Sequence, residues 1–171
     1  LCGLSNDSTM NEQLRKEHFK YNDIIQADFV DSYFNLTLKS LIAFKWAAMH
    51  FTNSQVRYVL KLDDDLFPNW HNILARVPTF DKPYVCSRLA GAKVSRDPKY
   101  IFHVTYAEFA NSHFPTYCDG SAYMVSFEMA QKIGSFNRIP KYFKFEDVYI
   151  TGILREHLNA DIQDVDWYHS R

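Results

Sequence analysis

The sequence predicts an α/β fold in a single domain that spans residues 1–171. Segments with the two-residue period of strands alternate with segments of helical period, which is typical of a sheet flanked by helices. No internal repeat, low-complexity tract or Pro/Gly-rich linker interrupts the chain. With 47% hydrophobic residues, a chain of 171 residues buries one sizeable core and leaves little for a second domain.

Two elements of the first half are predicted from their apolar spacing. A helix is expected over residues 38–49, with either Asn35 or Thr37 as its N-cap, because apolar residues fall on one stripe. The residues of this stripe are Leu38, Leu41, Ile42, Trp46 and Met49. Residues 56–62 alternate apolar with basic side chains and are rich in β-branched and aromatic types, which favours an interior strand.

The second half contains further strand and helix candidates. Residues 84–95 hold two short strand candidates and residues 100–105 resemble another, so a sheet of several strands is expected. Residues 126–134 predict a short helix that begins at a serine and closes at a glycine. A further helix is expected to start near Asp147, and residues 162–169 have the alternation of an extended strand. These patterns do not determine the order of the strands.

The composition argues against nucleic acid as the main partner. The 19 basic and 20 acidic residues give a formal net charge of −1, without the basic excess of a nucleic-acid-binding surface. Aromatic residues make up 16% of the chain, so its clefts should be lined by rings suited to stacking on sugars or bases. Composition alone does not distinguish these two ligand types.

Cysteine content and glycosylation sequons bear on the compartment. Cys2, Cys86 and Cys118 allow at most one disulfide within the chain and lack zinc-finger spacing. The triplets that begin at Asn6 and Asn35 fit the N-glycosylation sequon, which is used only in the secretory lumen, although such triplets also arise by chance. No apolar run spans a bilayer, and no initiator methionine or signal peptide opens the chain, so we expect a fragment whose membrane anchor lies upstream.

Three consecutive aspartates, Asp63, Asp64 and Asp65, follow the strand predicted at 56–62. Such a group is stable only where a cation neutralises it or water solvates it, and a solvated acidic turn is the simpler alternative. Ligands of open α/β sheets bind beyond the carboxyl ends of strands. Hard oxygen atoms at such a position suit Mn²⁺ or Mg²⁺ bridging a diphosphate, so a metal site is favoured.

A second acidic motif, Glu146 and Asp147, begins a predicted helix. Asp147 shares one helical face with Ile150 and Leu154, so its side chain should point inward. One interpretation is an acid that caps the helix or stabilises its dipole. The other is a general base, because burial raises the proton affinity of the carboxylate while the helix end keeps it ionised. Glu146 is the second candidate for that role.

Residues 114–123 combine aromatic rings, a rigid proline and a permissive glycine. This combination builds a tight loop that presents aromatic faces, so Tyr117, Gly120 and Tyr123 are candidates to line an acceptor or sugar site. The alternative is a packed connection whose tyrosines fill the core. The residues alone leave both interpretations open.

Several of these motifs occur in the order found in one enzyme family. They are residues 21–29 (YNDIIQADF), 31–39 (DSYFNLTLK), 58–67 (YVLKLDDDLF), 115–126 and 146–149 (EDVY). The ordered set resembles the β-1,3-galactosyltransferase-type family, glycosyltransferase family 31, which includes galactosyl- and N-acetylglucosaminyltransferases. A single piece such as the aspartate triplet is a weak signal, whereas the ordered set covers nearly the whole chain.

The resemblance implies a GT-A fold, a Rossmann-like mixed sheet flanked by helices, with a UDP-sugar donor and Mn²⁺ as cofactor. By their positions in the motifs, Asp65 would ligate the metal and His169 would complete the metal site. The nucleotide sugar would be contacted by Lys61, Asp63 and Asp64. Asp147 would deprotonate the acceptor hydroxyl in one displacement that inverts the anomeric carbon. The family segment with the first strand is absent, so the sheet is expected to lack that strand.

The implied function is transfer of galactose or N-acetylglucosamine from a UDP-sugar to a glycan hydroxyl on a glycoprotein or glycolipid, in β-1,3 linkage. The implied location is the Golgi lumen, as part of a type II single-pass membrane protein. One alternative is a paralogue of the same fold that binds a glycan or nucleotide without turnover, and another is a metal-dependent phosphoesterase. The presence of both Asp65 and Asp147 favours the transferase.

Overall fold

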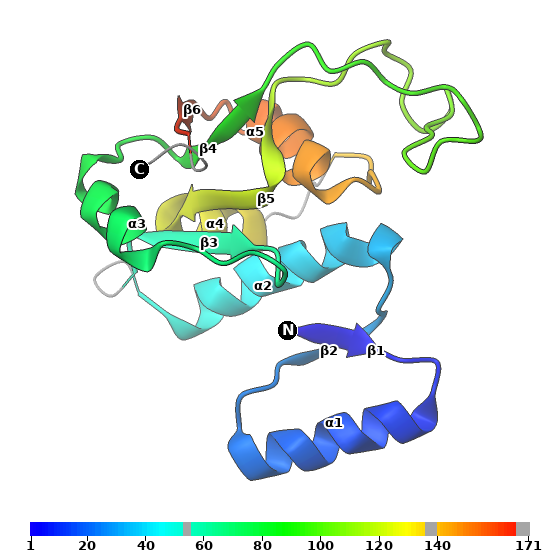
Figure 1. Cartoon of the computed structure of the whole chain (residues 1–171), viewed down its shortest axis with the longest axis vertical. Helices are drawn as coiled ribbons and strands as arrows, with labels where there is room; N and C mark the ends of the chain where they lie inside the picture. Colours follow the sequence, from blue (N-terminus) through cyan, green and yellow to red (C-terminus); the bar gives the residue numbers. More distant parts are fainter. Residues whose placement is uncertain (53–55, 136–139, 167–171) are drawn as a thin grey trace.

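The computed structural model describes residues 1–52, 56–135 and 140–166 of the chain. Strands and helices alternate along it, as the sequence predicts (Figure 1). The elements are β1 (Cys2–Leu4), α1 (Ser8–Tyr21), β2 (Gln26–Val30), η1 (Tyr33–Asn35), α2 (Leu36–His50), β3 (Tyr58–Leu62), α3 (Trp70–Arg76), η2 (Val77–Thr79), β4 (Tyr84–Leu89), β5 (Tyr117–Ser126), α4 (Phe127–Ser135), the π-helix η3 (Val148–Ile153), α5 (Leu154–His157) and β6 (Ile162–Asp164).

The main sheet has four strands in the order β3-β5-β4-β6. The long strand β5 pairs antiparallel with β3 on one side and β4 on the other, and β6 runs parallel to β4. The expected mixed sheet flanked by helices is therefore confirmed. The strand predicted over residues 56–62 forms as β3, but it lies at the edge of this sheet in the described part of the chain. Each β3 residue is half-buried, as expected for an edge strand covered on both faces.

Helices α2 and α4 pack against each other and against the sheet (Figure 1). The helix predicted over residues 38–49 is confirmed, but it buries Phe44 and Ala47 instead of the predicted stripe, of which Met49 is 71% exposed. At Gly134 in α4, an added Cβ would lie 2.8 Å from the Cα of Lys45, so glycine permits this close approach. The expectation that Gly134 closes its helix is wrong, since α4 continues to Ser135. The glycine serves helix packing instead.

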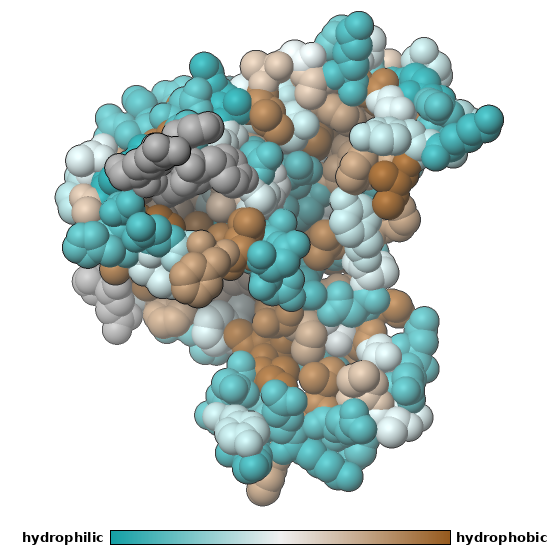
Figure 2. Space-filling view, in the orientation of Figure 1, coloured by the Kyte–Doolittle hydropathy of each residue, from teal (hydrophilic) through white to brown (hydrophobic). Residues whose placement is uncertain are grey.

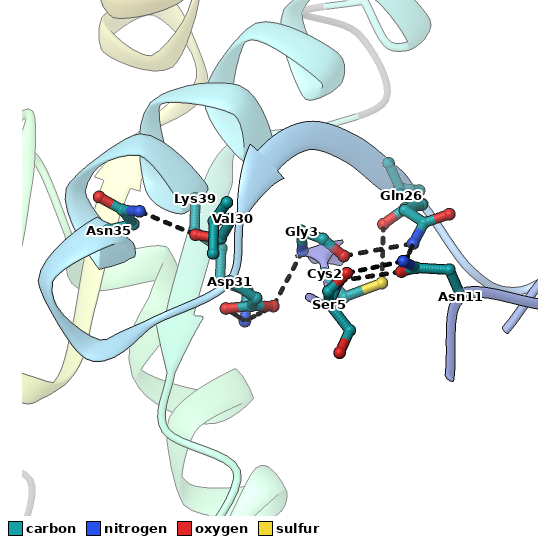
Figure 3. Close-up of polar contacts among 10 residues, drawn as sticks. Cys2, Gly3, Ser5, Asn11, Gln26, Val30, Asp31, Asn35 and Lys39 are labelled. Atoms are coloured by element: carbon teal, nitrogen blue, oxygen red, sulfur yellow. Dashed lines mark hydrogen bonds and ion pairs between the residues drawn. The ribbon is translucent and has the colours of Figure 1, made fainter. Parts of the chain in front are cut away.

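A small lobe, residues 1–30, lies beside α2 (Figure 1). Its strands β1 and β2 are parallel and are connected by α1. The Asp31 carboxylate joins this lobe to α2, because it accepts hydrogen bonds from Gly3 N at 2.8 Å and from Lys39 Nζ at 3.2 Å (Figure 3). Hydrophobic side chains gather where the small lobe meets α2 (Figure 2), at a hollow of about 800 Å³ bordered by Trp46.

The segment between β4 and β5 contains less strand than predicted. The second strand candidate in residues 84–95 is only an isolated bridge, and residues 100–105 form turns. These residues lack strand partners in the sheet, and the guanidinium of Arg96 instead donates to the carbonyls of Val104, Phe109 and Asn111. Residues 162–169 were predicted to be extended, and β6 covers their start, while residues 167–169 lie outside the described residues.

One disulfide, between Cys86 of β4 and Cys118 of β5, joins two strands of the core. The prediction of at most one bridge is thus confirmed, and Cys2 has a free thiol. Within the described residues, every helix is too short or too polar to traverse a bilayer.

Candidate active site

The two acidic motifs line one cleft of about 440 Å³. The cleft is formed by the end of β3, the first half of β5, the start of η3 and the segment between β4 and β5. Its wall includes Lys61, Asp63, Tyr117, Gly120, Glu146 and Asp147. The cleft therefore brings Asp63 of the first motif to Glu146 and Asp147 of the second, whereas Asp64 and Asp65 do not line it.

A bulge in β5 supplies one wall of the cleft. Cys86 of β4 pairs with Tyr123, whereas Arg88 pairs with Cys118, so the partner strand β5 has several extra residues between these pairs. Gly120 lies in this bulge, and a Cβ added there would come within 3.1 Å of Asp147 Oδ2. The absence of a side chain at Gly120 therefore makes room for the Asp147 carboxylate.

Asp147 occupies the N-terminus of η3 and faces the cleft. Its Oδ1 accepts a hydrogen bond from Val148 N at 2.7 Å, and its carbonyl accepts one from the Thr151 hydroxyl at 2.6 Å. Burial raises the pKa of Asp147, while the Val148 N–H and the positive charge of Lys61 oppose that rise. The capping role is thus observed, and the same contacts hold the carboxylate where a general base would be needed.

Glu146 is almost fully buried, at 6% exposure, although it borders the cleft. The Tyr123 hydroxyl donates a hydrogen bond to Glu146 Oε1. Burial raises the pKa of Glu146, and the bond from Tyr123 opposes the rise. Glu146 therefore has a structural role as a buried residue of the cleft wall beside Asp147. The prediction that Tyr123 lines the sugar site is wrong, because its side chain is wholly buried in the core.

The aspartate triplet divides between the cleft and solvent. Lys61 Nζ contacts both the Asp63 carboxylate and the carbonyl of Gly120, so Lys61 and Asp63 form part of the cleft wall. Asp64 and Asp65 lie on the exposed turn that follows and do not border this cleft. The structure thus brings Lys61 and Asp63 to Asp147, and leaves the other two aspartates at the surface.

The donor set fits a cation only in part. Among the described residues, no group of three His, Cys, Asp or Glu side chains is arranged to hold a metal ion. His169 lies outside the described residues. Asp65 supplies a hard oxygen on an accessible turn, and Mg²⁺-like ions are commonly held by one or two carboxylates together with substrate phosphates and water. Asp65 is one ligand of the kind that such an open site uses, and metal binding stays a prediction.

A comparison with protein families decides the affiliation. The family model described as Galactosyltransferase matches residues 1–166, nearly the whole chain. The chain belongs to the galactosyltransferase family. The resemblance to glycosyltransferase family 31 is thereby confirmed, and the mixed sheet flanked by helices is the GT-A-type domain of this family.

Curated relatives include two kinds of transferase. The chain is 35% identical over 159 residues to UDP-GalNAc:beta-1,3-N-acetylgalactosaminyltransferase 1 of Mus musculus and of Homo sapiens, covering 91% of this chain and 47% of each relative. It is 31% identical over 160 residues to Beta-1,3-galactosyltransferase 1 of Mus musculus, covering 91% of this chain and 48% of the relative. The chain spans about half the length of the curated relatives it matches.

The cleft of this family member also contains residues that the sequence analysis missed. Tyr33, Tyr100 and Phe102 line it with aromatic rings. Burial raises the pKa of Tyr33, and the carboxylates of Asp147 and Asp63 raise it further, so this hydroxyl lies near both acidic motifs. The available signal was the position of Tyr33 within the motif at residues 31–39, to which the sequence analysis assigned no role. No sequence pattern distinguishes Tyr100 or Phe102, because they follow turns rather than a regular strand.

The two sequons of this family member differ in accessibility. Asn6 is exposed. Asn35 is half-buried, and its side-chain amide donates to the carbonyl of Val30 at 2.8 Å (Figure 3). Thr37 of the same sequon is wholly buried and donates to Phe143 O at 3.0 Å. Glycosylation at either asparagine stays a prediction, and the surroundings favour Asn6.

Proposed function

We propose that this chain carries the catalytic cleft of an inverting UDP-sugar hexosyltransferase, which forms a β-1,3 linkage to a glycan hydroxyl. The observation that carries the proposal is the convergence of Asp147 with Lys61 and Asp63 in one cleft. Membership in the galactosyltransferase family and the names of the relatives support the same reaction. An inactive glycan- or nucleotide-binding paralogue is the alternative, and the retained Asp147 geometry disfavours it.

Asp147 acts as the general base. Burial raises the pKa of Asp147, which favours a proton acceptor, and the Val148 N–H and the charge of Lys61 oppose that rise. Because Oδ1 is held by Val148 N and Oδ2 lies against Gly120, the carboxylate has a fixed orientation in the cleft. A base in this position accepts the proton of the attacking hydroxyl and contributes roughly 10² to 10⁴ in rate.

Lys61 and Asp63 organise the donor side. The lysine holds Asp63 against the β5 bulge through the Gly120 carbonyl. In this proposal Asp63 and Asp64 contact the nucleotide sugar, and Asp65, with His169 beyond the described residues, holds Mn²⁺ or Mg²⁺. Such a cation supplies Lewis-acid stabilisation of the negative charge on the leaving diphosphate. Tyr117 and Gly120 border the space in which the sugar binds.

The same proposal covers the donor sugar, the acceptor and the cellular location. The donor sugar is galactose or an N-acetylhexosamine, and the acceptor is a glycan on a glycoprotein or glycolipid. We assign the protein to the Golgi lumen as a type II single-pass membrane protein. The disulfide between Cys86 and Cys118 supports an oxidising compartment, since such bonds are rare in the cytosol.

The deciding experiment uses the full-length protein with UDP-galactose, UDP-N-acetylgalactosamine and UDP-N-acetylglucosamine, with and without Mn²⁺. We expect transfer of one sugar with inversion, and UDP binding only when Mn²⁺ is present.

Asp147→Asn should retain UDP binding and lose about 10²- to 10⁴-fold in kcat. Asp161→Asn, a matched change at an exposed aspartate, should leave transfer unchanged. Full transfer by Asp147→Asn would remove this residue from the mechanism, and glycan binding without transfer by the wild type would favour the inactive paralogue.

A further inference from the structure

Three aromatic rings form an exposed group at the mouth of the cleft. Tyr33, Tyr100 and Phe102 all line the cleft and keep 52%, 52% and 39% of their surface exposed. The ring centroids of Tyr33 and Phe102 are 6.4 Å apart, and those of Tyr100 and Phe102 are 5.4 Å apart. The rings therefore make one continuous apolar surface, which we call the aromatic rim.

The aromatic rim is anchored to the segment that carries the proposed base. Phe102 makes an edge contact with Phe145, with ring centroids 5.7 Å apart. Phe145 is buried in the core and directly precedes Glu146 and Asp147. At the other end of the rim, the Tyr33 side chain lies close enough to Asp147 and Asp63 for their charges to raise its pKa. The rim thus has a fixed position beside the site of reaction.

The chemistry of the rim fits a sugar ring. The faces of aromatic rings carry negative partial charge and attract the positively polarised C–H groups that a pyranose presents on one face. The hydroxyl groups at the edge of that pyranose then remain available to Asp147, which lines the same cleft. A diphosphate would instead need cationic or N–H partners, which the rim does not offer.

We propose that Tyr33, Tyr100 and Phe102 form an acceptor subsite, on which a hexopyranose ring of the acceptor glycan stacks while its hydroxyl approaches Asp147. This inference rests on the proposed transferase function and adds to it the surface that binds the acceptor. The rings act on acceptor binding, and the donor is held elsewhere in the cleft. Removing a ring should therefore change the acceptor KM and spare the donor KM.

The test compares Tyr100→Ala, Tyr33→Ala and Tyr100→Phe in the full-length protein, using an oligosaccharide acceptor and the UDP-sugar that supports transfer. Each alanine variant should raise the acceptor KM about 2- to 12-fold, the range expected for one aromatic contact. The donor KM and the slow hydrolysis of UDP-sugar without acceptor should stay within twofold of wild type. Tyr100→Phe keeps the ring and should retain most acceptor affinity.

Ile101→Ala is the matched control, because Ile101 is 65% exposed between two rim residues and does not line the cleft. It should leave both KM values unchanged, and thermal unfolding of every variant checks that the fold is retained. Wild-type transfer with an unchanged acceptor KM in the alanine variants overturns the subsite alone, as does an equal rise in both KM values. Absence of transfer by the wild type overturns the proposed function, and the subsite with it.

Discussion

The two acidic ends of the cleft are built in different ways. At one end, Asp147 is half-buried, accepts a hydrogen bond from Val148 N and lies against Gly120. At the other end, Asp64 and Asp65 lie on an exposed turn that is joined to the cleft wall through Asp63 and its lysine partner. Contacts within the protein thus fix the orientation of the proposed base, whereas the carboxylates proposed to bind a cation lie on an exposed turn.

The largest effect is expected from removing the disulfide that lies beside the segment of Asp147. Cys118 N donates to Thr151 Oγ1, and Thr151 in turn donates to the carbonyl of Asp147, so the bridged strand supports the base. Since the bridge closes a loop with a sequence separation of 32, the double variant Cys86→Ala/Cys118→Ala should lose roughly 3 to 4 kcal/mol of unfolding free energy.

Urea unfolding of the full-length protein measures that loss, and transfer should fall with it. Cys2→Ala provides the control, since Cys2 has a free thiol and should change the unfolding free energy by less than about 1 kcal/mol. A double variant as stable as wild type would show that the bridge does not support this end of the cleft.

A smaller effect is expected from Gly120→Ala. The new methyl group would meet Asp147 Oδ2 at 3.1 Å and push the carboxylate by a few tenths of an ångström. Because small misplacements of a catalytic group are costly, kcat should fall about tenfold while UDP affinity stays unchanged. The matched change Gly134→Ala lies between α2 and α4, and should lower stability by about 1 to 3 kcal/mol with unchanged kcat per folded molecule. Equal kcat for Gly120→Ala and wild type would argue against a close fit at Asp147.

Lys61→Met should shift the pH dependence of transfer. The charge of Lys61 lowers the pKa of Asp147 against the effect of burial, so its removal lets that pKa rise. The acid limb of the kcat/KM profile should therefore move to higher pH, because the base stays protonated over a wider range. Lys93→Met alters another cation that lines the cleft and should leave the limb in place. An unmoved limb in Lys61→Met would separate this lysine from the base.

The smallest expected effect is on the stability of the Asp147→Asn and Asp65→Asn variants. Burial raises the folded pKa of Asp147 above its unfolded value, so the stabilisation from its protonated form is complete in acid and is lost as pH rises through the folded pKa. Asp147→Asn should accordingly have a higher Tm than wild type at pH 7, and a difference that shrinks near pH 3. The exposed Asp65→Asn should stay within about 0.5 kcal/mol of wild type at both pH values. A lower Tm for Asp147→Asn at pH 7 would contradict a burial cost at this site.

Regular elements were predictable because periodicity follows from the face that each one buries. The apolar spacing over residues 38–49 predicted the helix α2 but not its buried face, and the alternation over residues 56–62 became β3. Residues 100–105 were not predictable, because a β-rich composition does not reveal that they lack strand partners in the sheet and that the side chain of Arg96 instead donates to carbonyls of this segment. Contacts of one long side chain with distant carbonyls leave no periodic signal.

The sequence predicted the acidic residues of the candidate site better than it predicted the positions of the tyrosines. Asp147 was predicted to point inward from an α-helical phase, and it lines the cleft although the segment that follows it is the π-helix η3. Tyr117 and Tyr123 lie an even number of residues apart and would share one face of a regular strand. The bulge in β5 between them reverses this relation, so Tyr117 borders the cleft while Tyr123 fills the core. A bulge of this kind appears only when strand pairing is known.

The helix α1 buries none of its fourteen residues. It is held by the Asp7 side chain at its first turn and by the left-handed Asn22 at its end, rather than by a packed face. Segments with few buried contacts open locally at low free energy, while strands at the centre of a core open only when the whole domain unfolds. Amide protons of α1 should therefore exchange with solvent long before those of β5, and the cleft should outlast this helix when the protein is heated.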